Sequence, residues 1–134
     1  MSQENVESIR ELVAAFNRDD PDAFAALCLP DVEWEDTMFW SGTSRTYRGR
    51  EQVRAWFAEV REPWEDIQIA AEEVIEAGED TLVVPLRVSG RGRGSGVETE
   101  LLVWEVMSLA NGRTARRKVF RDRGEALEAA GIEE

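Results

Sequence analysis

The spacing of apolar residues changes near residue 62, and this change restricts the folds that the chain can adopt. Before it, apolar side chains recur every three or four residues from Gln3 to Asn17, from Asp20 to about Leu29, and from Gly49 to the residue before Pro63. This spacing predicts three helices, each with one apolar face. Asp20 followed by Pro21 is typical of an N-cap and a first helical position.

The second half of the chain is strand-like. Four segments with β-type composition run from Ile67 to Glu76, Thr81 to Val88, Val97 to Leu109 and Thr114 to Asp122, and RGEALEAAG predicts a short closing helix. Before them, Val32 begins an extended segment, and TMFWSGTSRTYRG (37–49) is predicted to be a loop or lid. The order predicts an α+β fold in which a curved antiparallel sheet wraps around the helices, as one domain over residues 1–134.

Composition narrows the possible partners. The chain has 28 acidic and 16 basic residues, a net charge of −12, which argues against nucleic acid or an anionic membrane. It has no histidine, so the commonest metal ligand and general base are missing, and we expect neither a metal nor another cofactor. Its single cysteine, Cys28, excludes an internal disulfide. With no signal peptide or apolar span at its start, a cytoplasmic protein is expected.

One acidic residue interrupts an otherwise apolar strand: Glu105, within LLVWEVMSLANG (101–112). Burying an unpaired carboxylate is costly, so Glu105 needs a cation, a proton or a polar cavity beside it. If ANG forms a three-residue loop, Glu105 lies opposite Arg117. If Asn111 and Gly112 form a two-residue turn, it lies opposite Lys118. Both registers place a cation beside the carboxylate.

The pair of Glu105 and Arg117 supports two interpretations. The first is a cross-strand ion pair that stabilises the hairpin by up to about 1 kcal/mol. The second places the pair at the floor of a pocket, where Arg117 holds Glu105 ionised to recognise a ligand or move a proton on it. Val103, Met107 and Val119 share the predicted face of Glu105 and would line that pocket.

Aromatic residues concentrate in the segments that would form the roof of such a pocket, where flat side chains suit an apolar or ring-containing ligand. Trp34, Trp40 and Tyr47 are favoured as ligand contacts. Core packing is favoured for Trp56 and Phe57, because they lie on the apolar stripe of a predicted helix. The ligand-binding candidates are Leu12, Phe16, Trp34, Trp40, Tyr47, Trp56, Phe57, Val103, Met107 and Val119, and the catalytic candidates are Glu105 and Arg117.

Four phrases cover nearly the whole chain: AAFNRDDPDAFAALCLPDVEW, YRGREQVRAWF, SGVETELLVWEVMSLANGR and FRDRGEALEAAGIEE. Together they resemble the SnoaL-like polyketide cyclase and ketosteroid isomerase group of the nuclear transport factor 2-like superfamily. The resemblance implies a cone-shaped, curved antiparallel sheet and three helices around a deep apolar pocket, often in a homodimer joined through the sheets. The superfamily places many activities on one scaffold, so the resemblance is specific for the fold and not for the chemistry.

Taken residue by residue, the resemblance transfers little of the family's chemistry. The base of the ketosteroid isomerases falls at Trp34, and the phenol of their oxyanion hole falls at Leu12. Their second oxyanion-hole group, a carboxylic acid, has a counterpart in Glu105, but an adjacent arginine does not suit a neutral acid. Steroid isomerisation by that mechanism is therefore not expected. Glu35 and Asp36 would replace the base only if a bulge turned one inward; otherwise they are solvated, or Asp36 caps a turn.

These observations lead to two hypotheses. In the leading one, the chain is a small-molecule pocket protein that binds an apolar or aromatic ligand, with proton transfer, isomerisation or cyclisation through Glu105 as a possible extension. In the competing one, it is a non-catalytic ligand-sequestering or dimerisation domain, in which Glu105 and Arg117 are a structural ion pair. The expected partners are a small apolar or aromatic molecule and a second copy of the chain.

Overall fold

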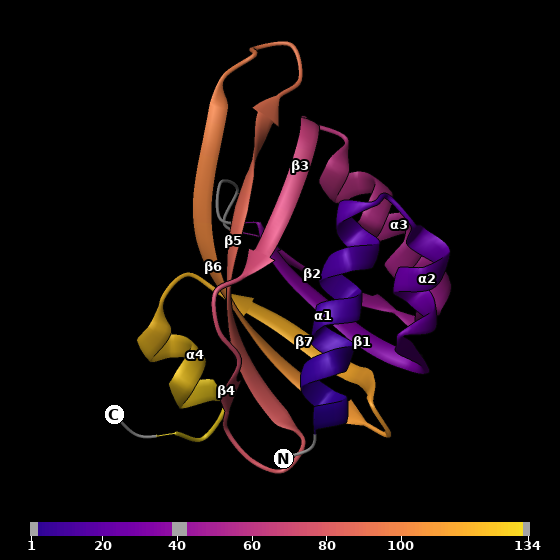
Figure 1. Ribbon diagram of the computed structural model, residues 1–134, viewed down its shortest axis with the longest axis vertical. Helices are drawn as coiled ribbons and strands as arrows, with labels where there is room; N and C mark the ends of the chain where they lie inside the picture. The colour runs from indigo at the N-terminus through magenta and orange to yellow at the C-terminus, as the bar shows by residue number, and fades with distance from the viewer. Residues whose placement is uncertain (1–2, 39–42, 133–134) are drawn as a thin grey trace.

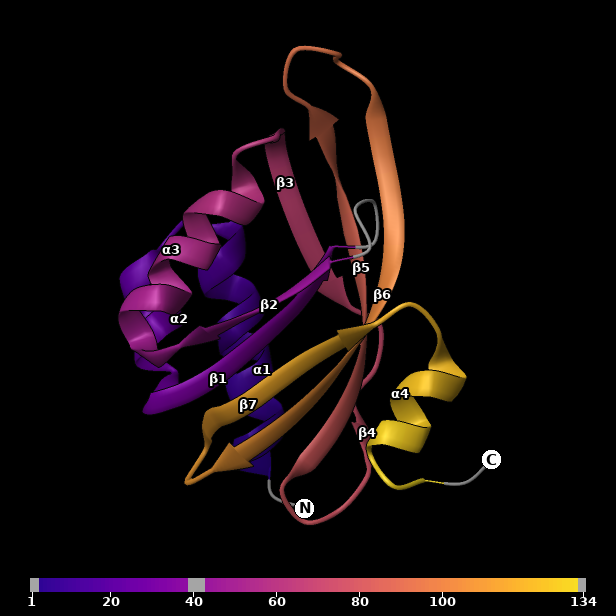
Figure 2. The ribbon, with the colours of Figure 1, turned by 180° about the vertical axis from the view of Figure 1, so that it is seen from behind.

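The three predicted helices lie together on one side of a curved sheet (Figure 1). The computed structural model describes residues 3–38 and 43–132. The helices are α1 (Gln3–Asn17), α2 (Pro21–Ala26) and α3 (Gly49–Arg61), and a fourth, α4 (Arg123–Ala129), lies on the other side of the sheet (Figure 2). In these described ranges no helix is long and apolar enough to cross a membrane.

Seven strands form one sheet within the described ranges. They are β1 (Cys28–Met38), β2 (Thr43–Arg48), β3 (Trp64–Ala71), β4 (Ile75–Glu76), β5 (Thr81–Gly92), β6 (Glu98–Ala110) and β7 (Arg113–Phe120). Their order is β2-β1-β7-β6-β5-β3, with β4 paired to β5. Neighbours are antiparallel except β1 and β7, which are parallel. The predicted α+β class with a curved sheet around the first helices is confirmed.

Three predicted boundaries are wrong. The second helix ends at Ala26 and not near Leu29, because Cys28 already pairs with β7 as the first residue of β1. The predicted loop over 37–49 contains β2, which pairs with β1. Phe39, Trp40 and the two residues after them lie outside the described residues. The predicted strand from Ile67 to Glu76 is divided into β3 and β4.

The hairpin of β6 and β7 has neither of the predicted registers. Ala110 pairs with Arg113 around a two-residue turn. Asn111 and Gly112 have φ values of 53° and 73°, as the favoured hairpin turn requires. A bulge just beyond Leu109 then shifts the register by one more residue.

This bulge changes the residue opposite Glu105. That residue is Val119, while Arg117 lies opposite Met107, so the expectation of a cation directly opposite Glu105 is wrong. Side chains alternate along a strand, so Glu105, Met107, Arg117 and Val119 still share one face of the sheet. Arg117 is a diagonal neighbour of Glu105, within reach of a long side chain. Lys118 lies on the opposite face.

The two faces of the sheet carry separate apolar clusters. The inner face, which meets α1, α2 and α3, includes Trp34 and Met107. The outer face carries a smaller cluster in which Val83 and Trp104 pack against Leu127 of α4. Alternation along β6 therefore sends Met107 inward and Trp104 outward, and the inner face holds the candidate site.

Candidate functional site

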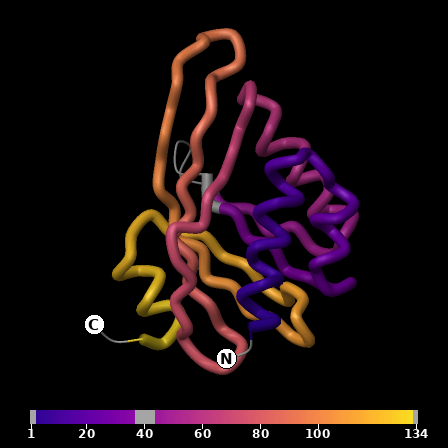
Figure 3. The backbone as a smooth tube through the Cα atoms, in the orientation of Figure 1, coloured from indigo at the N-terminus to yellow at the C-terminus, as the bar shows by residue number. Residues whose placement is uncertain are grey.

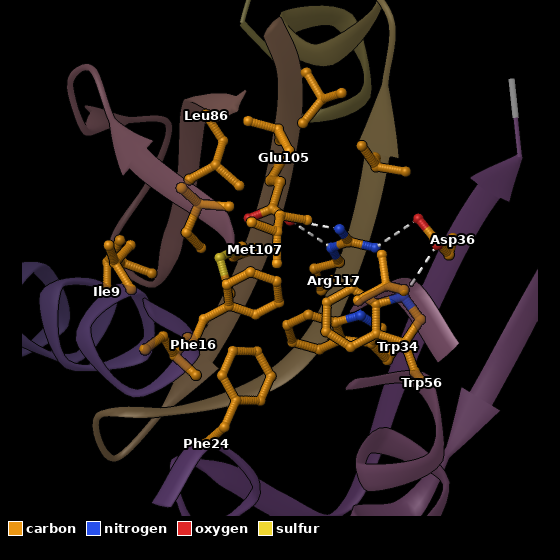
Figure 4. A pocket seen from close by; sticks show the side chains of 18 of the residues that line it. Ile9, Phe16, Phe24, Trp34, Asp36, Trp56, Leu86, Glu105, Met107 and Arg117 are labelled. Carbon is orange, nitrogen blue, oxygen red and sulfur yellow. Dashed lines mark hydrogen bonds and ion pairs between the residues drawn. The ribbon is translucent and has the colours of Figure 1, made fainter. Parts of the chain in front are cut away.

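A cavity of about 130 Å³ lies between the first three helices and the inner face of the sheet (Figure 4). Its described lining is apolar except for three charged side chains and the indole N–H groups of tryptophans. The lining residues are Ile9, Leu12, Val13, Phe16, Phe24, Trp34, Asp36, Trp56, Val60, Trp64, Ile67, Ile69, Leu86, Val88, Leu101, Val103, Glu105, Met107, Arg117 and Val119.

The lining changes from buried to exposed along the cavity. Met107 is only 2% exposed, whereas Leu101 of β6 is 36% exposed, and Trp64 and Val88 are half-buried. These more exposed residues lie toward the end of the molecule where β5 turns into β6, far from the start of α1 (Figure 3). The mouth of the cavity is therefore on that side.

Arg117 is the centre of the polar cluster in the cavity wall. Its Nε and Nη2 lie 2.7 Å and 2.5 Å from Oε2 of Glu105. Its Nη1 donates to Oδ1 of Asp36 at 3.1 Å and to the backbone carbonyl of Glu35 at 2.9 Å. Glu105 and Arg117 are 7% and 5% exposed. The guanidinium thus joins β7 to β6 and to β1.

Asp36 is the second carboxylate of this cluster. Its Oδ2 accepts a hydrogen bond of 3.0 Å from the indole Nε1 of Trp56, while its Oδ1 faces Arg117 (Figure 4). Two donors from different elements therefore fix Asp36, and both of its oxygens are occupied. In contrast, both contacts of Glu105 with Arg117 go to Oε2. Oε1 accepts no hydrogen bond from any residue that the structure describes, and Figure 4 shows it directed away from Arg117.

The cluster fixes the charge of Arg117. Burial opposes the positive charge of its guanidinium, but the carboxylates of Glu105 and Asp36 raise the pKa of Arg117 above its ordinary value. Arg117 is therefore a permanent cation. A carboxylate that accepts hydrogen bonds from such a cation suits the role of acceptor and not that of donor. Glu105 can accept a hydrogen bond or a proton at Oε1.

Two tryptophans complete the wall around Arg117. The guanidinium carbon lies 4.7 Å from the ring centre of Trp34 and 5.3 Å from that of Trp56, within the range of cation–π attraction. Phe24 packs edge-on against Trp34 with ring centres 5.4 Å apart. The buried Nε1 of Trp34 has no hydrogen-bond partner in the part of the chain that the structure describes.

The structure brings most of the predicted site residues to this cavity. Its described lining includes Leu12, Phe16, Trp34, Trp56, Val103, Glu105, Met107, Arg117 and Val119. The structure places Tyr47 and Phe57 elsewhere: both are buried, but Tyr47 lies on β2 and Phe57 packs against Phe16 and Phe24. Trp40 lies outside the described residues. That these residues contact a ligand stays a prediction.

Sequence reasoning missed the role of Asp36, which it expected to be solvated or to cap a turn. The signal was present, because Trp34 and Asp36 are two residues apart on a strand and so face the same side. No bulge between them is needed to turn Asp36 inward. The helix residues Ile9 and Phe24 were also missed as lining residues.

Comparison with known proteins agrees with this architecture. Residues 9–117 match the family model of the SnoaL-like domain, and the chain belongs to this family. Proteins with this domain are typically polyketide cyclases or related enzymes. No curated protein matches the chain significantly.

Three solved structures illustrate the shared fold. An NTF2-like protein of unknown function from Burkholderia pseudomallei is 28% identical, with a TM-score of 0.77 over 96% of this chain and 97% of its own. SalBIII, an epoxide hydrolase/cyclase-like enzyme of pyran ring formation in salinomycin, is 19% identical, with a TM-score of 0.75 over 90% and 92%. A cystatin-fold protein from Novosphingobium aromaticivorans is 20% identical, with a TM-score of 0.71 over 90% and 99%.

Proposed function

We propose that this protein binds a small apolar or ring-containing molecule in the cavity beneath α1, α2 and α3. The Glu105 carboxylate, held by Arg117, receives a hydrogen bond or a proton from that molecule. The position of Glu105 carries the proposal: a carboxylate that is 7% exposed borders an apolar cavity, and its Oε1 has no partner among the described residues. A carboxylate oxygen that borders the cavity and receives no donor from the described residues can accept a hydrogen bond from a ligand.

The cavity volume limits the buried part of the ligand. An apolar cavity of about 150 Å³ in another protein holds one benzene molecule. The cavity of about 130 Å³ therefore suits one six-membered ring. A larger compound would extend past Trp64 and Leu101 toward the mouth.

Glu105 is better suited to removing a proton than to supplying one. Arg117 holds it through two contacts to Oε2, and a guanidinium does not give up a proton in a protein. The reaction class that fits a carboxylate acceptor in an apolar site is removal of a proton next to a carbonyl group, which begins many isomerisations and cyclisations. We propose this chemistry for Glu105 where the bound molecule carries a carbonyl group within reach of Oε1.

An aromatic ligand screen on the wild type and on Glu105→Gln tests the proposal. Gln keeps the shape of Glu105 but removes its charge, so we expect at least a tenfold loss of affinity in a variant that still folds. Glu35→Gln is the matched control, because it removes the same charge from a residue whose side chain pairs with the exposed Lys118. Equal affinities for wild type and Glu105→Gln, with a lower melting temperature for the variant, would contradict the proposal.

One observation favours the competing function, a non-catalytic domain with a structural ion pair. Arg117 joins three strands, β7, β6 and β1, and its own backbone lies in the regular part of the parallel pairing of β1 with β7, opposite Trp34. Under this alternative, Glu105→Gln lowers stability and leaves ligand affinity unchanged. A homodimer joined through the sheets is then the proposed assembly, and sedimentation equilibrium measures it.

A further inference from the structure

The charges of the cavity wall do not cancel. Arg117 contributes one positive charge, and Glu105 and Asp36 each contribute a carboxylate. No other residue among the described lining is charged. With both carboxylates ionised, the wall carries one more negative charge than positive.

The one cation of the wall has little capacity left for a ligand. A guanidinium has five N–H donors, and Arg117 makes four contacts to protein acceptors, namely Glu105 twice, Asp36 and the Glu35 carbonyl. The faces of Trp34 and Trp56 cover it. A negatively charged ligand group would therefore find no free cation and would lie beside two carboxylates.

Two hydrogen-bonding positions in the described wall lack a partner: the acceptor Oε1 of Glu105, which borders the chamber, and the buried donor Nε1 of Trp34. Oε1 of Glu105 points away from Arg117 into a chamber walled by apolar side chains such as Leu86 and Met107 (Figure 4). An apolar wall lowers the local dielectric constant, so a charge there is screened less than in bulk water. A ligand group that both donates a hydrogen bond and carries positive charge satisfies Oε1 and balances the wall.

We propose that the ligand class of this cavity is a ring-bearing organic amine in its protonated form, with its ammonium group donating to Glu105 Oε1 and its ring in the apolar chamber. This inference rests on the proposed function, because it names the ligand of the same site. Under this proposal, the cavity binds a positively charged ring compound more tightly than a neutral or negative one of equal size. Phe16 and Phe24 belong to the apolar lining that would contact the ring of the ligand.

Three probes of nearly equal size and different charge test this selectivity: benzylamine, benzyl alcohol and benzoate. Their dissociation constants for the full-length protein are measured by titration calorimetry at pH 7 and moderate salt. We expect benzylamine to bind at least tenfold more tightly than benzyl alcohol, and benzoate to bind more weakly than both. Glu105→Gln should remove the preference for benzylamine, and Asp36→Asn should reduce it.

The control separates the site from the overall charge of −12, which attracts every cation weakly. Glu35→Gln changes the net charge as Glu105→Gln does, and it should keep the preference for benzylamine. If both variants lose it equally, the charge selectivity does not come from the cavity and the inference is wrong.

The remaining outcomes distinguish the two proposals. If benzyl alcohol binds in a Glu105-dependent manner and benzylamine binds no more tightly, the amine inference is wrong while the proposed function stands. If none of the three probes binds, both fail. Thermal unfolding of each variant establishes that it is folded, and Asp36→Asn provides the second variant if Glu105→Gln does not fold.

Discussion

Three consecutive cations on β7 occupy very different surroundings. The side chains of Arg116 and Lys118 are 73% and 52% exposed and pair with Glu33 and Glu35 on the outer face of the sheet. Arg117 between them is 5% exposed and points to the inner face. All three side chains are basic. Only the alternation of side chains along the strand directs one of them, Arg117, toward the cavity.

This contrast shows which ion pairs bear on function. Exposed pairs on the outer face are screened by water and are worth about 0–1 kcal/mol each. The buried pair of Arg117 and Glu105 must overcome a desolvation cost of several kcal/mol per ion. We propose that such a pair beside an apolar cavity serves ligand recognition or the specificity of the fold, and single substitutions can separate these uses.

The largest expected effect comes from Arg117→Met. This change leaves Glu105 and Asp36 buried without their cation, and breaking a buried pair in this way costs about 3–5 kcal/mol. Arg116→Met and Lys118→Met should each cost less than about 1 kcal/mol. Urea unfolding of the three variants measures the free energies. Equal losses of unfolding free energy at the three positions would contradict the distinction between the two faces of the sheet.

Filling the cavity should abolish binding with a smaller effect on stability. Val103→Phe places a ring in the chamber, and we expect at least a tenfold loss of benzylamine affinity. Stability should change by less than about 1.5 kcal/mol, because the added volume enters an existing void. Val106→Phe is the control, since Val106 belongs to the cluster on the outer face. Calorimetric titration that finds undiminished binding to Val103→Phe would place the ligand elsewhere.

A smaller gain is expected from Thr114→Val on the buried side of β7. The Thr114 side chain is fully buried, and its Oγ1 has no hydrogen-bond partner in the described part of the chain. An apolar group of the same shape removes this unsatisfied atom and should stabilise the fold by about 1 kcal/mol. The urea midpoint reports the change, and a decrease would mean that Oγ1 has a partner after all.

The smallest expected effect is at Cys28. Burial raises the pKa of its thiol to about 12, and a nearby Arg50 opposes this shift. The folded protein should therefore react with a thiol reagent at pH 8 far more slowly than the unfolded protein does. Because the folded pKa exceeds the unfolded value of 9.0, the associated stability is present below pH 9 and is lost as the pH rises toward 12. Rapid labelling of the native chain would contradict this burial.

Much of the fold could be predicted from the sequence, because its signals are local. The spacing of Val6, Ile9, Leu12 and Phe16 defines α1, and Asp20 with Pro21 defines the start of α2. The parallel pairing of β1 with β7 could not be predicted, because it joins residues far apart in the chain. The start of β1 at Cys28 depends on that same pairing.

The sequence predicted that Glu105 would have a cation as its partner in the candidate site, but it did not predict the geometry of that contact. A carboxylate in an apolar strand needs a cation, a proton or a polar cavity beside it, and the two hairpin registers offered Arg117 or Lys118 as the cation. The register depends on one bulge that no residue type in the hairpin predicts. Arg117 therefore contacts Glu105 diagonally and does not lie directly opposite it, as one predicted register had it. Asp36 was missed because its partners, Arg117 and Trp56, come from distant elements.

A crystal structure of the protein with benzylamine is the most direct test of the central claim that Glu105 faces an occupied chamber. We expect the ring to lie between the first three helices and the sheet, with the nitrogen of benzylamine within about 3 Å of Glu105 Oε1. A chamber filled by side chains, or benzylamine bound only on the outer face, would contradict the account.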